Sequence, residues 1–149
     1  MSLRSQTRSD YRHFQSIPTR WMDNDIYGHV NNVHYYSYFD TAVNQFLIER
    51  GVLDIHRGDT VGFVVETACS YFNPIAFPDQ VQAGMRVEHI GNSSVRYGVG
   101  LFRNDDAQLA AAGNFTHVYV NRSTGKSVPV PVAVRQVLEA LRWPDPGLR

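Results

Sequence analysis

The spacing of apolar residues predicts a strand and a long helix in the first third of the chain. Residues 11–21 are typical of a strand, and Pro18 favours an edge position because proline cannot donate a hydrogen bond to a neighbouring strand. Over 33–50 the apolar residues recur every three or four positions, as in an amphipathic helix. The predicted apolar stripe of this helix comprises Tyr36, Phe39, Val43, Phe46 and Leu47.

Polar and glycine residues mark both ends of this predicted helix. Asn31 or Asn32 is a suitable N-cap, because a short polar side chain can accept a hydrogen bond from a free backbone N–H. Gly51 is a suitable terminator, because glycine adopts the left-handed conformation that ends many helices. The helix is therefore expected to occupy the whole interval between them.

After residue 51 the apolar residues alternate with period two, which predicts four strands. The residues expected to share a face in the first three strands are Phe63, Val65, Thr67, Cys69 and Tyr71; Val81, Ala83, Met85 and Val87; and Val95, Tyr97, Val99 and Leu101. Residues 109–120 are expected to form the fourth strand. Residues 131–142 then predict a short closing helix. This order indicates an α+β fold, with a flexible N-terminus at 1–10, one domain at 11–143 and a C-terminal tail at 144–149.

Composition narrows the classes of function. The 149 residues suit one domain, and 14 basic residues balance 14 acidic ones, so the charge shows no footprint of nucleic-acid binding. The lone Cys69 excludes an internal disulfide and lies in an apolar run, where we expect a small buried side chain. With no signal peptide and no apolar run of membrane-spanning length, we predict a cytoplasmic protein. The preference for Arg over Lys is typical of a bacterial genome rich in G and C.

Residues 20–32 hold the strongest candidate chemistry. The carboxylates of Asp23 and Asp25 stand before the predicted helix, followed by Gly28, His29 and the adjacent pair Asn31 and Asn32. The first turn of a helix presents free N–H groups and a partial positive charge, which can stabilise a developing oxyanion. A carboxylate seven residues upstream could act on the same carbon.

The spacing alone leaves other interpretations open. A calcium loop would need an acidic ligand where His34 stands, and an Asp-x-Asp phosphotransferase would need a parallel sheet. The pair His29 and His34 lacks a third metal ligand nearby. A simple capping turn explains the same residues as well as a catalytic site does.

A family resemblance favours the catalytic interpretation. The motif resembles the signature of hotdog-fold thioesterases of the 4-hydroxybenzoyl-CoA thioesterase type, and the order of elements agrees over about residues 10–143. The matching residues are Asp23-x-Asp25-x-x-Gly28-His29-Val30-Asn31-Asn32-x-x-Tyr35-x-x-Tyr38-Phe39, Tyr71-x-x-Pro74, Asp79 and Ile90-Gly91-x-Ser93-Ser94. The resemblance implies a long central helix wrapped by a five-stranded antiparallel sheet.

The resemblance also implies roles in thioester hydrolysis. Asp25 is the expected catalytic carboxylate, either as a nucleophile or as a general base. The backbone N–H of Asn32 is expected to polarise the thioester carbonyl, and Gly28 to permit the tight turn. We expect His29 and Asn31 to support the turn. Related short-chain members have histidine at the position of Asn32, where this chain departs from them. Apolar surroundings that would raise the basicity of Asp25 are expected from Trp21, Ile26 and Tyr27.

For the substrate, the resemblance implies an acyl-CoA, with no metal and no cofactor besides the CoA of the substrate itself. Tyr36 is a candidate for the acyl pocket, together with Phe39 and Val43, and Ser93 and Ser94 are candidates for contacts to the CoA moiety. The candidate phosphate ligands are Arg86, Arg96, Arg103, Arg122 and Lys126.

The implied assembly is a homodimer or homotetramer with sites at the interface. No Gly-x-Ser-x-Gly motif offers a serine nucleophile. The alternatives are an acyl-carrier-protein thioesterase, a non-catalytic acyl-CoA-binding protein, and a structural dimer without activity. A hydratase would need an Asp/His pair, and His89 and His117 lack its local pattern.

Overall fold

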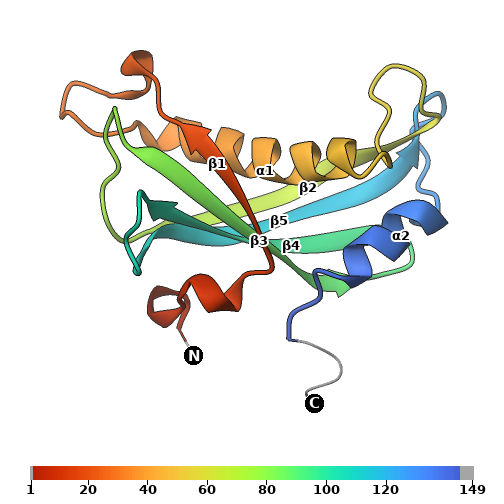
Figure 1. The fold of residues 1–149 in the computed structure, drawn as a ribbon. Coiled ribbons are helices and arrows are strands. Elements are labelled where there is room, and N and C mark those ends of the chain that lie inside the picture. Colours follow the sequence, from red (N-terminus) through yellow and green to blue (C-terminus); the bar gives the residue numbers. More distant parts are fainter. Residues whose placement is uncertain (1, 145–149) are drawn as a thin grey trace.

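A five-stranded antiparallel sheet curves around one long helix (Figure 1). The computed structural model describes residues 2–144. The order of strands across the sheet is β1-β3-β4-β5-β2. The main elements are β1 (His13–Pro18), α1 (Tyr35–Glu49), β2 (Thr60–Tyr71), β3 (Gln80–Ile90), β4 (Ser94–Arg103), β5 (Leu109–Asn121) and α2 (Val132–Glu139). The predicted α+β hotdog fold is therefore confirmed, with β1 at one edge as its proline requires.

The long helix begins slightly later than predicted. A 3-10 turn, Asn32–His34, precedes α1, and the Asn31 side chain caps this turn by accepting a hydrogen bond of 3.1 Å from Val33 N. At the other end Gly51 has a φ of 71°, the left-handed conformation that terminates a helix. Both predicted end signals are thus present.

One aromatic residue of the predicted stripe was placed on the wrong face. Tyr36 is 44% exposed, whereas Tyr35 and Tyr38 are buried. Either tyrosine at 35 or 36 continues a three-to-four spacing, so the pattern did not decide between them. The buried face of α1 consists of Tyr35, Tyr38, Phe39, Ala42, Val43, Phe46 and Leu47.

The concave face of the sheet meets α1, and the two central strands follow the predicted alternation. Their buried residues on this face are Val81, Ala83, Met85 and Val87 of β3, and Val95, Tyr97, Val99 and Leu101 of β4. Strand β5 contributes Phe115 and Tyr119 to the same core. The core is therefore a helix packed into a curved sheet.

Strand β2 departs from the predicted alternation because it contains a bulge. Its register with β5 shifts between Val64 and Glu66. Before the shift Phe63 pairs with Val118, and after it Thr67 pairs with Phe115. The extra residue turns Phe63 to the opposite face from Thr67, where its side chain is 63% exposed. A shared face for Phe63 and Tyr71 was therefore wrong.

The convex face of the sheet is covered by the N-terminal segment. Residues 2–10, predicted to be flexible, form two 3-10 turns, and Gln6 and Tyr11 are buried. Beside them Arg86 is 2% exposed, with hydrogen bonds of 3.0 Å to Glu88 and 3.1 Å to the carbonyl of Asp10. Its guanidinium also lies 3.9 Å from the centroid of the Trp143 ring. Of the predicted tail at 144–149, residues 145–149 lie outside the described residues.

Candidate active site

The loop between β1 and α1 forms a tight turn around Asp25. Asn24 and Val30 form an antiparallel bridge, and within it Asp25 N donates to the carbonyl of His29 at 2.8 Å. Gly28 N donates to the carbonyl of Asp25 at 3.0 Å, and Gly28 has a φ of 82°. Only glycine adopts this conformation without strain, so the turn requires it, as the sequence predicted.

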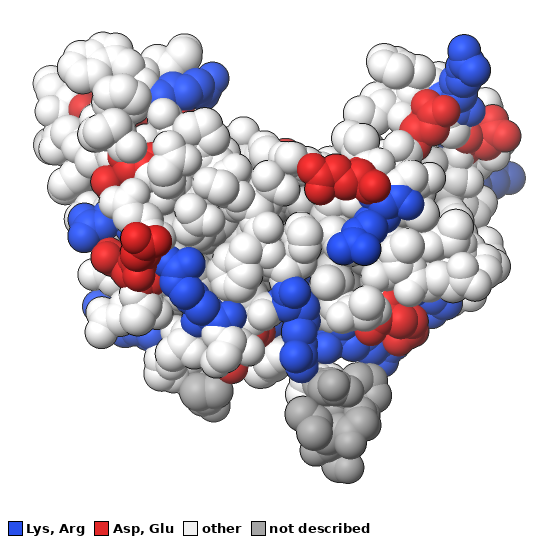
Figure 2. Space-filling view, viewed as in Figure 1, with Lys and Arg blue, Asp and Glu red and all other residues white. Residues whose placement is uncertain are grey.

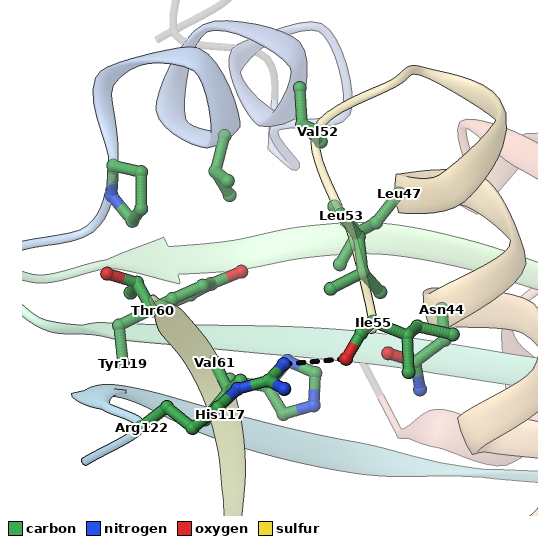
Figure 3. Close-up of a pocket in the computed structure, with 13 residues that line it drawn as sticks. Asn44, Leu47, Val52, Leu53, Ile55, Thr60, Val61, His117, Tyr119 and Arg122 are labelled. Atoms are coloured by element: carbon green, nitrogen blue, oxygen red, sulfur yellow. Dashed lines mark hydrogen bonds between the residues drawn. The ribbon is translucent and has the colours of Figure 1, made fainter. Parts of the chain in front are cut away.

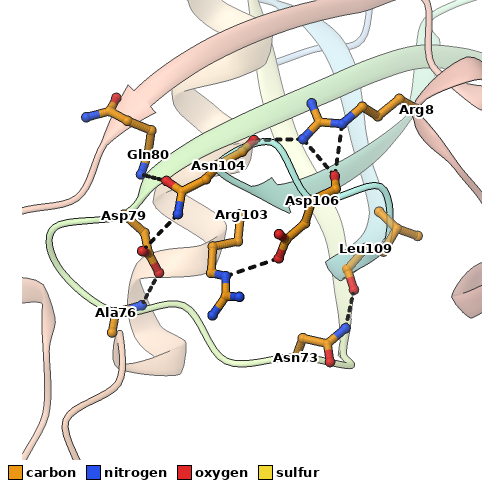
Figure 4. Close-up of polar contacts among 9 residues, drawn as sticks. All are labelled: Arg8, Asn73, Ala76, Asp79, Gln80, Arg103, Asn104, Asp106 and Leu109. Carbon is orange, nitrogen blue, oxygen red and sulfur yellow. Dashed lines mark hydrogen bonds and ion pairs between the residues drawn. The ribbon is translucent and has the colours of Figure 1, made fainter.

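A second loop, residues 72–79, fixes the position of this turn. Val30 N donates to the carbonyl of Ile75 at 2.7 Å, and Asn24 Oδ1 accepts from Phe77 N at 3.0 Å. The second loop is itself held at Asp79, whose carboxylate accepts from Ala76 N and from the Asn104 side chain, each at 3.0 Å (Figure 4). The Asp25 turn is therefore anchored by the bond from Val30 N and by the Asn24 side chain, and not by the Asp25 carboxylate.

Asp23 and Asp25 have different surroundings. The carboxylate of Asp23 is 1% exposed and accepts hydrogen bonds from Arg20 N at 2.8 Å, Arg20 Nε at 2.9 Å and Tyr38 OH at 3.3 Å. Burial alone would raise the pKa of Asp23, but the hydrogen bonds and charge of Arg20 outweigh it and hold this pKa below its ordinary value. The Asp23 carboxylate thus stabilises the structure of the loop.

Asp25 is more available. Asp25 is only partly buried, and the one hydrogen bond that its carboxylate accepts from residues 2–144 comes from Tyr27 N to Oδ1 at 2.9 Å. Its second carboxylate oxygen accepts none from these residues. The apolar residues expected around Asp25 do not enclose it in the single chain, because Trp21, Ile26 and Tyr27 are 79%, 94% and 83% exposed.

The start of the helix offers an unpaired donor. Asn31 N donates to the carbonyl of Asp23 at 2.8 Å, and Val33 N donates to the Asn31 side chain. Asn32 N–H lies between these two groups and donates to no atom of the described residues. A free N–H at a helix N-terminus can bind an anionic oxygen. The His29 side chain is exposed and makes no hydrogen bond within residues 2–144, so its carbonyl alone supports the turn.

Ser93 and Ser94, two of the other predicted substrate contacts, do not lie near Asp25 within one chain. Tyr36 OH lies 3.5 Å from the carbonyl of Thr67. Ser93 and Ser94 are at the turn between β3 and β4, where the Ser93 carbonyl accepts from Tyr119 N at 2.7 Å. This turn lies at the opposite end of the sheet from Pro18, which pairs with Gln80 at the start of β3.

The predicted phosphate ligands also differ in availability. Arg86 is buried and bound to Glu88, so a phosphate cannot reach it. Arg96 and Arg103 pair with Glu88 and Asp106, at 3.3 Å and 3.1 Å. Arg122 donates to the carbonyl of Ile55 at 2.6 Å. Lys and Arg alternate with Asp and Glu over the face in Figure 2, which shows no large area of one sign.

A cavity of about 310 Å³ lies at the far end of α1 (Figure 3). It is formed by α1, β2, β5, α2 and the loop after α1; the residues that line it are Asn44, Leu47, Val52, Leu53, Ile55, Thr60, Val61, Gly62, His117, Tyr119, Arg122, Pro131 and Val134. Sequence analysis missed it because these elements are distant in the chain. One signal was present: His117 interrupts the apolar face Phe115-x-His117-x-Tyr119 of β5.

Other chemistries find little support in the described residues. Cys69 is partly buried, and burial raises the pKa of its thiol to about 11, so it is not a thiolate at neutral pH. Within residues 2–144 no three His, Cys, Asp or Glu side chains are grouped as metal ligands would be. None of the helices in that range is long and apolar enough to cross a membrane.

Comparison with known proteins places this geometry in a family. Residues 19–138 match the model of the thioesterase-like superfamily. The solved PA5185 protein from Pseudomonas aeruginosa is 53% identical, with a TM-score of 0.89 over 91% of this chain and 95% of that one. The PA2801 protein of the same species is 28% identical, with a TM-score of 0.80 over 85% and 98%. A DHNA-CoA thioesterase from Staphylococcus aureus shares the fold, at 19% identity over 85% and 86% and a TM-score of 0.75. Because the matched model spans most of the chain and includes the Asp25 loop, the protein belongs to the thioesterase-like superfamily.

Proposed function

We propose that the protein hydrolyses acyl-CoA thioesters and is a member of the 4-hydroxybenzoyl-CoA thioesterase type. The observation behind this proposal is the pairing of two unused groups on one loop. Asp25 keeps a carboxylate oxygen without a partner in residues 2–144, and the Asn32 N–H, seven residues later, is equally unpaired. A base or nucleophile beside an oxyanion donor is the minimum that acyl transfer needs.

The chemistry follows from these two groups. The Asn32 N–H donates to the thioester carbonyl oxygen, on which negative charge accumulates as the tetrahedral intermediate forms. In one route Asp25 attacks the carbonyl carbon, the C–S bond breaks to release the CoA thiolate, and water hydrolyses the resulting anhydride. In the other route Asp25 takes a proton from water, whose oxygen attacks the same carbon; the tetrahedral intermediate then collapses, the C–S bond breaks, and the CoA thiolate leaves and takes up a proton. Both routes yield a carboxylic acid and CoA.

A second copy of the chain is part of the proposal. Strand β2 pairs with β5 on one side, and in the described chain its other side is a free edge with Phe63 and Val65 63% and 55% exposed. A long apolar edge is normally covered by a partner strand. Antiparallel pairing of two β2 strands about a twofold axis would join the two sheets into a homodimer. Two such dimers can associate into a homotetramer while the β2 edges stay paired within each dimer.

Thiol release from a panel of short, long and aromatic acyl-CoAs tests the proposal, with acyl-carrier-protein thioesters as a separate arm. Asp25→Asn should lower kcat by about 10²–10⁴, the usual contribution of a general base. Asp105→Asn is the matched control, because Asp105 is exposed and makes no hydrogen bond in the described chain. Full activity in Asp25→Asn would overturn the mechanism. Failure of the wild type to cleave any thioester in the panel would overturn the proposed activity.

A further inference from the structure

The cavity at the far end of α1 combines an apolar wall with one polar group. Leu47, Leu53 and Val134 are typical of its aliphatic lining. Its volume of about 310 Å³ is at the small end of the range for ligand pockets, roughly 300–1,000 Å³. If each heavy atom needs about the 30 Å³ that a water molecule takes in the liquid, the cavity holds about ten non-hydrogen atoms. This size suits a medium-length acyl group better than a long one.

The polar group is the imidazole of His117. It is 2% exposed, and its Nδ1 is buried without a hydrogen-bond partner among residues 2–144. The ring lies over Gly62, where a Cβ atom would come within 2.9 Å of Nδ1, so glycine provides the space that the imidazole occupies. Buried polar groups nearly always have a hydrogen-bond partner. An unpaired imidazole on the wall of a cavity therefore indicates a ligand with a matching polar atom.

The protonation state of His117 limits which polar groups of a ligand can pair with its ring. Burial lowers the pKa of His117 to about 4, so the ring is neutral near pH 7. A neutral imidazole has one N–H donor and one acceptor nitrogen. A hydroxyl group can pair with either nitrogen, because it both donates and accepts. A carboxylate could pair only with the donor.

The geometry of β2 decides which Asp25 this cavity can serve. Thr60 at the start of β2 lines the cavity, whereas Tyr71 at its end packs edge to face against Tyr35, with ring centroids 4.8 Å apart. Tyr35 is the first residue of α1 and directly follows the 3-10 turn that begins at Asn32. The cavity and the Asp25 loop are therefore at opposite ends of the same strand. Antiparallel pairing of two copies over the full length of β2 places Thr60 of one copy beside Tyr71 of the other.

We propose that this cavity receives the acyl group of a thioester bound at Asp25 of a second copy, and that His117 selects aliphatic acyl groups with a hydroxyl near their far end. The inference rests on the proposed thioesterase activity and adds the class of acyl group. Each site then takes its carboxylate from one copy and its acyl specificity from the other. The turn at Ser93 and Ser94 lies at the cavity end of the sheet, because the Ser93 carbonyl accepts a hydrogen bond from the N–H of Tyr119, which lines the cavity.

The specificity is tested with octanoyl-CoA and 8-hydroxyoctanoyl-CoA. The wild type should favour the hydroxylated thioester in kcat/KM by roughly threefold to tenfold, the worth of one neutral hydrogen bond. His117→Phe should abolish or reverse this preference in kcat/KM, because its ring has no nitrogen to pair with the hydroxyl group. His89→Phe is the matched control, since His89 is exposed. An unchanged preference in His117→Phe would overturn the role of His117 while leaving the thioesterase proposal intact.

The contribution of the second copy is tested with mixed dimers. Ile55→Trp fills the cavity from its exposed rim, so it should block octanoyl-CoA turnover without disturbing the core. A tandem-purified heterodimer of one Asp25→Asn copy and one Ile55→Trp copy holds one intact composite site out of two. It should recover about half of the wild-type activity, because the symmetry gives two equivalent sites. No recovery in a verified heterodimer would show that the cavity serves its own Asp25.

Binding of the free acids provides a readout without turnover. Calorimetry with 8-hydroxyoctanoate and octanoate should show tighter binding of the hydroxylated acid by the wild type, and equal binding by His117→Phe. This result would support the cavity even if no acyl-CoA were hydrolysed, which separates the two proposals. Equal affinity of the folded wild type for both acids would overturn the selection by His117, and a thermal melt of each variant confirms folding.

Discussion

Neutralising the two carboxylates of the Asp25 loop should have different effects: Asp23→Asn should lower stability, and Asp25→Asn should lower activity. Asp23→Asn replaces a carboxylate that accepts three hydrogen bonds with an amide that has a single acceptor oxygen. At least one of the donors, Arg20 N, Arg20 Nε or Tyr38 OH, must then face an amide NH₂ in a site that is 1% exposed. The cost appears in the free energy of unfolding, because a buried donor is left without its partner.

The magnitude follows from the separate contacts of Asp23. A charge-assisted bond such as that from Arg20 N is worth about 1.5–3 kcal/mol. The Arg20 side chain is 61% exposed, so its ion pair adds at most about 1 kcal/mol. The Tyr38 OH bond, at 3.3 Å, is long and adds little. We therefore expect Asp23→Asn to lower the free energy of unfolding by ~2–3 kcal/mol, and Tm by about 5–10 °C for a chain of this size.

Asp25→Asn should behave differently. Its carboxylate accepts one hydrogen bond, from Tyr27 N in an exposed turn, and an amide oxygen can replace it. The free energy of unfolding should stay within about 0.5 kcal/mol of the wild type, while thioesterase activity falls. Urea denaturation followed by circular dichroism measures the first quantity, and thiol release well below Tm measures the second. If Asp23→Asn were as stable as the wild type, or if Asp25→Asn were the destabilised variant, the assignment of roles would be refuted.

Three further predictions concern the core. His117 has a pKa lowered by burial to about 4, so between pH 6.5 and 4 the unfolded chain binds a proton that the folded chain does not. The free energy of unfolding should therefore fall as pH falls through this window, by up to about 1.4 kcal/mol per pH unit. Urea denaturation at a series of pH values should show a smaller change for His117→Phe than for the wild type. An equal change in both proteins would contradict a neutral, buried His117. Gly113→Ala should destabilise by about 3 kcal/mol or more, because its Cβ would collide with the carbonyl of Ala68 on β2; a normal urea midpoint would refute the close packing. Arg86→Met should lower stability by about 1–2 kcal/mol, because the hydrogen bonds of Arg86 to Glu88 and to the Asp10 carbonyl are lost while Glu88 keeps Arg96. It should also expose the residues 2–10 to limited proteolysis, and an unchanged cleavage pattern would count against this anchoring role.

Local patterns predicted those features that depend on neighbours in sequence. The alternation in β3 and β4 identified the buried faces because one side of each strand packs against α1. Gly28 and Gly51 were predicted as turn positions because their backbone conformations exclude most other residues. Asp25 and Asn32 were assigned roles through a family resemblance, and those roles remain predictions.

Features that depend on distant contacts could not be predicted. The bulge in β2 adds one residue without a change in composition, so nothing in the sequence placed Phe63 on the opposite face from Thr67. Tyr35 and Tyr36 fit a helical stripe equally well, and only the packing of α1 against the sheet determines which of the two is buried. Arg86 lies on a strand, as an exposed cation would, and only the fold reveals that Glu88 and Trp143 enclose it.

The separation of the Asp25 loop from the far cavity along α1 bears on how such a protein can diversify. No residue belongs to both, and the loop is held to residues 72–79 by the bond from Val30 N and by the Asn24 side chain. None of residues 72–79 lines the cavity, so mutations that reshape the cavity leave Asp25 and the Asn32 N–H in place. Under the proposed function, a gene encoding this chain can therefore acquire a new substrate preference in single steps, each of which preserves the proposed hydrolytic step.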